Sequence, residues 1–374
     1  MFEKRGRRGL IKVGAVTVAL ALMAAACGDD DDDGTSAEGG DGGGEAVKIA
    51  LLLPETKTAR YETQDRPLFE AKVEDLCPDC EILYSNADQD AAAQQSQAEA
   101  ALTNGADVLV LDPVDSASAA SIVSQAKAQD VPVIAYDRLI TDAEIDYYIS
   151  YDNEKVGELQ ATALTDRLAD DSVDSGSLVM INGAPTDNNA TLFKDGAHSV
   201  FDESDYEIGA EYDTPDWSPD RARDEMEQAI TRLGDDGFVG VYAANDGTAG
   251  GAIAAMKSAG IDPLPPVTGQ DAELAGIQRI LAGEQYMTVY KAIKPQAETT
   301  AEVAIALARG EDPPEDLVNQ QVDNGQLEVP SMIFDPVSVT TDNVADTVVA
   351  DEYWTVDQIC EGDFQSACEE AGIS

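Results

Sequence analysis

Short apolar runs alternate with longer amphipathic or Ala-rich segments between residues 47 and 309. Runs such as 108–111 and 131–136 are almost wholly apolar, which is typical of strands covered on both faces of a sheet. The segments between them have the length and composition of helices. We predict strands at 47–53, 81–85, 108–111, 131–136, 177–181, 206–212, 239–243, 267–269 and 287–290, and helices at 65–76, 91–104, 116–129, 154–170, 190–203, 219–233, 247–259, 272–282 and 295–309.

The alternation of strands and helices occurs in two similar series along the chain. A regular βαβα order favours a mostly parallel sheet with helices on both faces. The second series begins with the helix predicted at 154–170. We therefore predict an α/β protein built from two Rossmann-like lobes with a cleft between them. The tail from Ile333 onward predicts only short extended pieces.

The first 27 residues have the features of an export signal. A basic segment at 1–12 is followed by the small, apolar run 13–26, which is too short to span a bilayer comfortably. Cys27 follows three alanines, so this segment resembles a bacterial lipoprotein signal, in which the cysteine is acylated. We predict a signal peptide at 1–26 and an exported protein anchored to the outer face of the cell membrane through Cys27. A periplasmic protein without the lipid is the alternative.

Residues 28–45 contain no apolar side chain larger than Ala. Such a segment cannot bury enough surface to offset its ordering entropy, so we predict that 27–45 forms a flexible acidic tether behind the acylated cysteine. The five aspartates at 29–33 could suggest calcium, but they lack the spaced ligands and turn glycine of a calcium loop. We predict neither a metal site nor a cofactor.

The formal net charge of −50 limits the classes of partner. Nucleic acid and anionic membrane surfaces would be repelled, so we predict no nucleic-acid partner and membrane contact only through the lipid. Acidic ligands are disfavoured too, unless a local group of Arg and Lys overrides the average. With 43% hydrophobic residues the chain has ample core material for two domains.

Five cysteines divide into one near the export signal and two local pairs. With Cys27 assigned to the lipid, an even set remains in an oxidising compartment. The CxxC spacing of the first pair also occurs in redox motifs and zinc sites, but the chain has no second CxxC and only one His. We predict two local structural disulfides, formed by Cys77 with Cys80 and by Cys360 with Cys368.

Polar residues gather where the predicted strands of both series end. Because ligands in open α/β sheets bind beyond the carboxyl ends of strands, groups from both lobes could face one cleft. Acidic, basic and amide side chains bond neighbouring hydroxyls in fork-like pairs, and aromatic rings cover the C–H face of a sugar. This mixture favours an uncharged, hydroxyl-rich ligand. The polar groups lie at 55–65, 137–138, 187–189, 216–218, 245–246, 270–271 and 291.

Several runs at these positions carry a family resemblance. The chain resembles the periplasmic sugar-binding proteins of ABC importers, in particular their D-xylose-binding members, in order over about residues 47–345. The resemblance implies capture of a monosaccharide by hinge closure and its delivery to ABC permease subunits, without chemistry on the sugar, by a monomer. The runs are 135–140, 146–160, 187–190, 245–252, 269–276 and 287–291.

The resemblance also implies a type I periplasmic-binding-protein fold, in which three crossings form the hinge between the lobes. We place the crossings near 152–153, near Lys291 and near 326–330. The N-terminal lobe would then comprise 46–152 and 291–327. The C-terminal lobe would comprise 153–290 and 328–374, including the C-terminal tail.

Ten residues match ligand contacts of the family. Arg60 and Tyr61 match an Arg that bonds hydroxyls and a stacking ring, although the D-xylose binders have Trp where this chain has Tyr61. An extra residue around 62–64 affects how these two side chains are placed. Trp217 would be the opposite stacking wall. The polar contacts would be Asp137, Arg138, Asp187, Asn189, Asn245, Asp271 and Lys291.

Each of these residues also has a purely structural interpretation. Asp137 and Arg138 could form a surface pair, and Asp271 could cap the helix predicted at 272–282. We assign the cap of the helix at 247–259 to Asp246 or Gly247 and leave Asn245 to the ligand. Tyr242 and Tyr290, which lie inside predicted strands, are assigned to the core.

A glycosidase is the main alternative from a different class, because Asp137 and Asp271 could serve as paired carboxylates. Neighbouring cations such as Arg138 would lower the pKa of a general acid, which argues against it. The single His198 lies within a predicted helix, and 247–251 lacks the Lys of a phosphate-binding loop. A transcriptional repressor of similar fold is disfavoured by the export signal and by the lack of a basic recognition helix.

Overall fold

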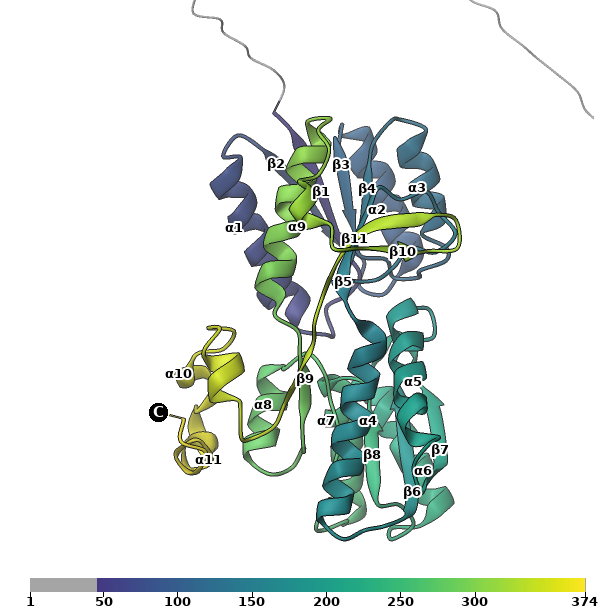
Figure 1. The fold of residues 1–374 in the computed structure, drawn as a ribbon, viewed down its shortest axis with the longest axis vertical. Coiled ribbons are helices and arrows are strands. Elements are labelled where there is room, and N and C mark those ends of the chain that lie inside the picture. Colours follow the sequence, from purple (N-terminus) through teal and green to yellow (C-terminus); the bar gives the residue numbers. More distant parts are fainter. Residues whose placement is uncertain (1–45, 374) are drawn as a thin grey trace, which may run out of the picture. The chain divides into compact units, whose positions relative to one another are not determined.

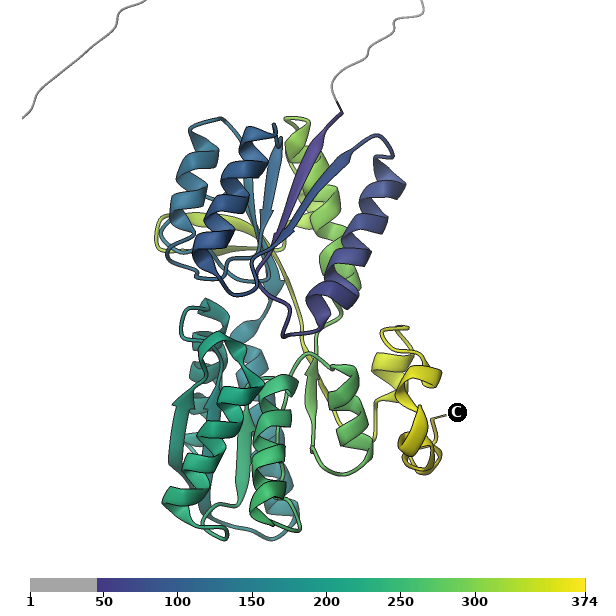
Figure 2. The same ribbon diagram turned by 180° about the vertical axis from the view of Figure 1, so that it is seen from behind.

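The computed structural model describes residues 46–373 (Figures 1 and 2). The predicted signal peptide, the predicted acylation site Cys27 and the predicted tether lie outside these residues. No helix within 46–373 combines the length and the apolar character that crossing a membrane requires.

The N-terminal lobe contains a seven-stranded sheet in the order β10-β11-β5-β4-β3-β1-β2, parallel except for the pairing of β10 with β11. Alternate residues of β1 point to opposite faces, so Leu51 packs under α1 and α9 whereas Leu52 packs under α2 and α3. The strands are β1 (Lys48–Leu53), β2 (Glu81–Asn86), β3 (Val108–Leu111), β4 (Val133–Tyr136), β5 (Tyr147–Tyr151), β10 (Gln320–Asp323) and β11 (Glu328–Phe334), and the helices are α1 (Arg66–Leu76), α2 (Ala91–Thr103), α3 (Ala120–Lys127) and α9 (Ile293–Ala308).

The C-terminal lobe has a parallel sheet in the order β7-β6-β8 and an antiparallel pair, β12 with β9. Helices α4 and α5 cover one face and approach closely, because a Cβ on Gly157 would lie 1.9 Å from the carbonyl oxygen of Phe193. Helices α6 and α7 cover the other face. The strands are β6 (Gly176–Asn182), β7 (Tyr206–Asp213), β8 (Gly240–Ala243), β9 (Thr288–Tyr290) and β12 (Val337–Val339), and the helices are α4 (Asn153–Asp170), α5 (Asn188–Phe201), α6 (Pro219–Leu233), α7 (Asp246–Ala259) and α8 (Leu274–Leu281).

The chain passes between the lobes three times: after β5, after β9 and after β11 (Figure 1). The third passage corrects the sequence prediction. Because β11 pairs with β5, residues 328–334 belong to the sheet of the N-terminal lobe, and the chain leaves that lobe after Phe334. The predicted crossing at 326–330 lies instead at a hairpin, whose Asn324-Gly325 turn has the left-handed Gly (φ 92°) that such turns favour.

Two further segments differ from the sequence prediction. The strand expected at 267–269 makes only single bridges, since Pro265 and Pro266 before it offer no N–H to extend a ladder. The tail after residue 344 is largely helical rather than extended, because Val344 and Val348 bury one face of a π-helical turn (Ala345–Val349). Helices α10 (Val356–Ile359) and α11 (Gln365–Glu370) follow.

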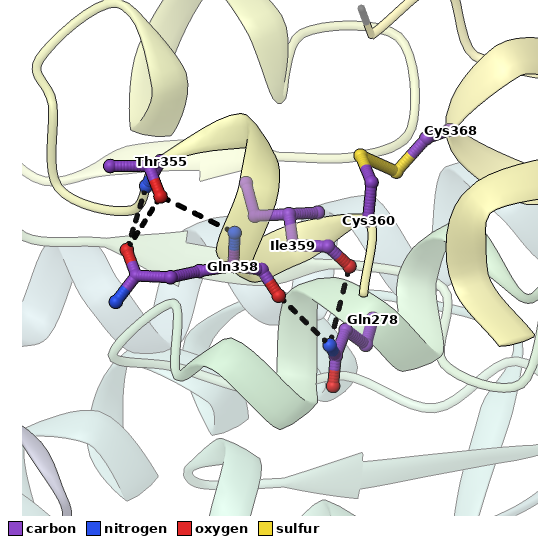
Figure 3. The surroundings of a disulfide bond; sticks show 6 residues. All are labelled: Gln278, Thr355, Gln358, Ile359, Cys360 and Cys368. Carbon is purple, nitrogen blue, oxygen red and sulfur yellow. Dashed lines mark hydrogen bonds between the residues drawn. A yellow bond between two sulfur atoms is a disulfide. The ribbon is translucent and has the colours of Figure 1, made fainter. Parts of the chain in front are cut away.

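Both predicted disulfides are present. Cys77 and Cys80 close the end of α1, and Cys360 and Cys368 join α10 to α11 (Figure 3). The second bond fixes the shape of the C-terminal segment, which lies beside α8 (Figures 1 and 2).

Candidate ligand-binding site

One cavity between the lobes is lined by all ten residues that the sequence predicts as ligand contacts. Each of them is at most 5% exposed. The cavity is small, with about 20 Å³ open to a water-sized sphere, which is room for about one water molecule. A larger ligand therefore needs the walls to move apart. The lining residues are Thr58, Arg60, Tyr61, Asp137, Arg138, Asp187, Asn189, Phe193, Trp217, Asn245, Gln270, Asp271 and Lys291.

Arg60 is held rigidly in the wall of the N-terminal lobe. It precedes a π-helical turn (Tyr61–Asp65), which brings Asp65 back to accept two hydrogen bonds from its guanidinium, at 2.9 and 2.6 Å. Gln296 of α9 accepts a third at 3.3 Å. Its remaining nitrogen, Nη1, lies 3.4 Å from Asp137 Oδ2. Three fixed contacts thus direct the free end of the guanidinium toward the cavity.

The hydroxyl of Tyr61 joins the acid and the base of the first lobe. It donates to Asp137 Oδ2 and accepts from Arg138 Nη2, both at 3.2 Å. The guanidinium carbons of Arg60 and Arg138 lie 5.1 and 5.7 Å from the centre of its ring. The ring is therefore part of a cationic cluster, and its stacking on a ligand stays a prediction.

Asp137 follows β4 in a left-handed conformation (φ 58°), which turns its carboxylate into the cavity. Its carbonyl oxygen accepts hydrogen bonds from Ser150 Oγ at 2.6 Å and from Asn189 Nδ2 at 3.0 Å. Burial alone would raise the pKa of its carboxyl, but Arg60, Lys291 and Arg138 together hold that pKa below its ordinary value. Asp137 is accordingly an ionised hydrogen-bond acceptor.

Arg138 reaches from the first lobe toward carboxylates on both sides. Its Nε lies 3.0 Å from Asp187 Oδ2 of the other lobe and 3.6 Å from Asp112 Oδ1. Asp112 is fully buried, and burial raises the pKa of its carboxyl well above the ordinary value. The sequence analysis did not select Asp112, although it too directly follows a buried strand.

Asp187 and Trp217 hold each other in the wall of the C-terminal lobe. Asp187 caps α5 by accepting from the Asn189 N–H at 2.8 Å, and it accepts from the indole Nε1 of Trp217 at 3.1 Å. The indole also packs edge-on against Phe193, with ring centres 6.3 Å apart. A Cβ on Gly183 would lie 2.0 Å from the indole, so only glycine leaves space for it.

The cap of α7 differs from our assignment. Asn245 is the cap, because its side chain accepts from the Thr248 N–H at 2.9 Å. Asp246 is instead buried against Gln285 (2.6 Å) and Thr288 (3.0 Å), away from the cavity. An Asn cap with an extended backbone satisfies the first turn of the helix, so Asp246 is free to pair elsewhere. Asn245 both caps the helix and lines the cavity.

Asp271 and Lys291 complete the cavity lining near the second crossing between the lobes. Lys291 Nζ lies 3.2 Å from Asp271 Oδ1, and Arg60 Nη1 of the opposite lobe lies 3.8 Å from the same oxygen. Asp271 does not cap a helix, because α8 begins only at Leu274. Both side chains line the cavity as an ion pair that a ligand can reach.

The lining is balanced in charge and rich in acceptors. Its three cations, Arg60, Arg138 and Lys291, face the carboxylates of Asp137, Asp187 and Asp271. Within residues 46–373, three buried lining oxygens accept no hydrogen bond: Asp137 Oδ1, Asp271 Oδ1 and Gln270 Oε1. Buried acceptors without donors are costly. The lining therefore suits an uncharged ligand that carries several hydroxyl donors.

The sequence analysis did not commit to three lining residues. Phe193 lies in a predicted helix, where an aromatic side chain indicates core packing. Gln270 stands beside Asp271 at a strand end, the same signal that identified its neighbour. Thr58 carried no signal beyond its place in the polar loop after β1.

Two α/β lobes, three crossings and a closed cavity between the carboxyl ends of their strands define a type I periplasmic binding protein. A comparison with known families agrees: residues 49–312 match the periplasmic binding protein domain. The chain belongs to this family, and within it to the sugar-binding proteins of ABC importers.

Comparison with individual proteins shows which members of the family the chain is similar to. It is 39% identical to the D-xylose-binding periplasmic protein of Escherichia coli K12, over 82% of this chain and 91% of that protein. It is 34% identical to a multiple sugar-binding periplasmic receptor of Rhizobium radiobacter, over 73% and 81% of the two chains. An ABC transporter solute-binding protein from Clostridium phytofermentans, solved with bound β-D-glucose, has a TM-score of 0.77 and 29% identity, over 83% and 99%.

Proposed function

We propose that this protein captures a single monosaccharide, D-xylose, outside the cytoplasm and delivers it to the permease subunits of an ABC importer. The observation that carries the proposal is the charge-balanced cavity with acceptors from both lobes. A sugar would supply hydroxyl donors without adding charge. Two of the relatives are D-xylose-binding periplasmic proteins, which supports that sugar over others.

Capture requires the lobes to open and close. The ten lining residues are at most 5% exposed, so a sugar can reach them only when the lobes part. On closure, each buried hydroxyl must meet a partner or cost about 1–3 kcal/mol. An epimer that misplaces one hydroxyl would therefore bind less favourably by about 1–3 kcal/mol.

Another aldose, such as glucose, galactose or arabinose, is the second candidate. It is favoured by the multiple sugar-binding relative and by the solved neighbour with bound β-D-glucose. Tyr61, where the resemblance expects Trp, is the lining residue that most directly separates the two candidates, because a smaller ring leaves more space beside the sugar.

Binding without chemical change is part of the proposal. A glycosidase needs a carboxyl that stays protonated to act as general acid. The pKa of Asp137 is lowered, which opposes this role. Incubation with a set of aryl glycosides and oligosaccharides should yield no hydrolysis product, and any turnover that Asp137→Ala removes would contradict the proposal.

The lipid anchor is a further part of the proposal. Acylation of Cys27 would keep the protein at the outer face of the membrane, and Cys27→Ser should release it into the soluble fraction. Mass spectrometry of the N-terminal peptide would identify the lipid directly. An unmodified Cys27 in the purified membrane fraction would contradict the anchor and leave sugar binding unaffected.

Titration with a panel of monosaccharides tests the central claim. Isothermal calorimetry and tryptophan fluorescence should detect D-xylose at lower concentration than D-glucose, D-galactose or L-arabinose. Tighter binding of a hexose would select the second candidate. No response to any pentose or hexose would overturn sugar binding.

A further inference from the structure

The backbone that presents Asp271 to the cavity is strained. Asp271 and the following Ala272 have φ values of 88° and 47°, and neither is glycine. Residues with a Cβ adopt this left-handed region rarely, and the conformation persists only where the surroundings hold it. Whatever holds this turn therefore also sets the position of the Asp271 carboxylate.

Two aromatic residues of the C-terminal segment hold the turn from one side. The Tyr353 hydroxyl donates to the carbonyl of Asp271 at 3.3 Å, and the indole Nε1 of Trp354 donates to the carbonyl of Ala272 at 2.8 Å. From the other side, the Asp271 N–H donates to the Val289 carbonyl at 2.9 Å. The turn is clamped between β9 and residues 353–354.

Tyr353 is also connected to the opposite lobe. Gln64 Nε2 donates to the Tyr353 carbonyl at 3.0 Å. Gln64 belongs to the π-helical turn that directly follows Arg60. The ring of Tyr353 packs edge-on against Tyr290, beside the second crossing, with centres 5.2 Å apart. One tail residue thus contacts the ligand-bearing elements of both lobes.

The segment behind these aromatics is anchored to α8. Gln278 donates to the carbonyls of Gln358 and Ile359, at 3.3 and 3.2 Å (Figure 3). The Cys360–Cys368 disulfide closes the loop that follows. Residues 353–354 are therefore presented from a braced unit rather than from a free chain end.

We propose that Tyr353 and Trp354 are positioning residues for the ligand site. They fix the turn at Asp271 so that its carboxylate meets one particular hydroxyl of the bound sugar. The proposal rests on the proposed function, because it assigns to the tail a role in the same site. It places a determinant of affinity in a segment that does not line the cavity.

The test uses Tyr353→Phe, which removes one hydroxyl and keeps the ring. Tyr290→Phe is the matched control, because it removes a hydroxyl that bonds Asp351 within the same aromatic cluster and not the Asp271 turn. Calorimetry would compare D-xylose, or the tightest-binding aldose, with its monodeoxy analogues. Asp271→Asn identifies which hydroxyl Asp271 meets, as the one whose removal costs that variant least.

Tyr353→Phe should weaken binding of the parent sugar roughly three- to tenfold, the effect of losing one modest hydrogen bond. The analogue that lacks the hydroxyl identified with Asp271→Asn should bind Tyr353→Phe and wild type within about twofold of each other. Tyr290→Phe should change every affinity less than about twofold. A merely structural tail would instead weaken all the sugars by one common factor.

A uniform loss across the analogues, or no loss with Tyr353→Phe, would overturn the positioning role while leaving sugar binding intact. If the wild type binds no sugar, the proposed function itself fails. Thermal melting checks that the variants fold. Trp354→Phe, which removes the indole donor of the clamp together with part of the ring, should reproduce the same analogue pattern if Tyr353→Phe is unstable.

Discussion

The two walls of the cavity are built on different principles. In the N-terminal lobe Arg60, Tyr61, Asp137 and Arg138 bond mainly to one another and to Asp65. In the C-terminal lobe the side chains are held by local caps, turns and pairs, such as the bond between Trp217 and Asp187. Asp187 and Asn245 cap helices, and Trp217 and Asp271 sit in left-handed turns. The first wall is one connected network, whereas the second consists of several separate local groups of contacts.

This difference indicates which wall is ready for a ligand before closure. Among the residues that line the cavity, three contacts cross the cleft: Arg138 with Asp187 at 3.0 Å, Arg60 with Asp271 at 3.8 Å, and the Asn189 amide with the Asp137 carbonyl at 3.0 Å. When the lobes part, Asp187 and Asp271 each lose an arginine. The N-terminal wall keeps its own pairs. We therefore expect a sugar to dock first on the N-terminal wall.

The largest effect is expected from breaking the connected wall. Asp137→Ala removes the carboxylate that faces Arg60 Nη1 and accepts from the Tyr61 hydroxyl. We expect a loss of affinity of at least about 100-fold, since truncating one member of a buried charge pair costs about 2–5 kcal/mol. Asp271→Ala should also abolish tight binding, with a smaller loss. Calorimetry measures both, and circular dichroism confirms the fold. A larger loss with Asp271→Ala would reverse the assigned order of the walls.

The next effect concerns the contacts between the walls. Asn189→Ala removes the donor to the Asp137 carbonyl and the acceptor of the Asn153 amide. We expect binding to weaken about tenfold, because one hydrogen bond that forms on closure and one that holds Asn189 within its own lobe are both lost. Small-angle scattering should show a more extended sugar-free protein than the wild type. An unchanged affinity would mean that this bridge plays no part in closure.

A smaller effect is expected from one separate contact of the second wall. Trp217→Phe keeps an aromatic ring but removes the indole donor to Asp187, so affinity should fall roughly threefold to tenfold. The chain has only two tryptophans, and Trp217 is the one in the cavity. The fluorescence response to sugar should therefore vanish in Trp217→Phe and persist in Trp354→Phe. A persisting response in the first variant would place the sugar away from Trp217.

The smallest effect on the cavity comes from two acids behind the second wall, the fully buried Asp246 and the half-buried Glu273. Burial raises the pKa of Asp246 to about 7 and that of Glu273 to about 8, although Arg279 lowers both. A folded-state pKa above the unfolded value near 4 means that this stabilising contribution is full below about pH 4 and is lost as pH rises to about 7 or 8. Asp246→Asn should flatten the fall of unfolding free energy between about pH 4 and pH 7, the window between the unfolded and folded pKa of Asp246.

Urea denaturation across that pH range measures this slope. The absolute stability of Asp246→Asn can be lower, because an amide cannot accept all the hydrogen bonds that the carboxylate accepts, so only the slope is diagnostic. Sugar affinity should change little. An equally steep slope in the variant would show that Asp246 is not the buried titrating group.

Much of this architecture follows from the sequence because the period of the hydrophobic pattern and the length of each segment decide it. The apolar runs at 108–111 and 131–136 became strands with four buried residues each. The polar residues after such runs then had to share one edge of the fold. The resemblance added which of them face a ligand, and all ten were found on one cavity.

The structure differs from the sequence predictions where contacts between segments far apart in the sequence decide the outcome. Nothing local distinguishes β11 as a partner of β5 rather than a strand of the other lobe, so the third crossing was predicted too early. The caps were misassigned because Asn245 and Asp246 are both good cap residues, and only the buried partners of Asp246 settle the choice. The clamp on Asp271 joins residues 82 positions apart, a separation that no local pattern reveals.

The order of strands in the first sheet has a consequence for how the chain is made. β1 is synthesised early, yet the sheet is complete only when β11, ending at Phe334, has joined β5. Helix α9, which covers one face of that sheet, also comes after the whole run from α4 to β9. If the chain is exported N-terminus first, the N-terminal lobe can be completed only after α9 and β11 have followed. Its slowest folding step would therefore come late, once roughly the last hundred residues are available.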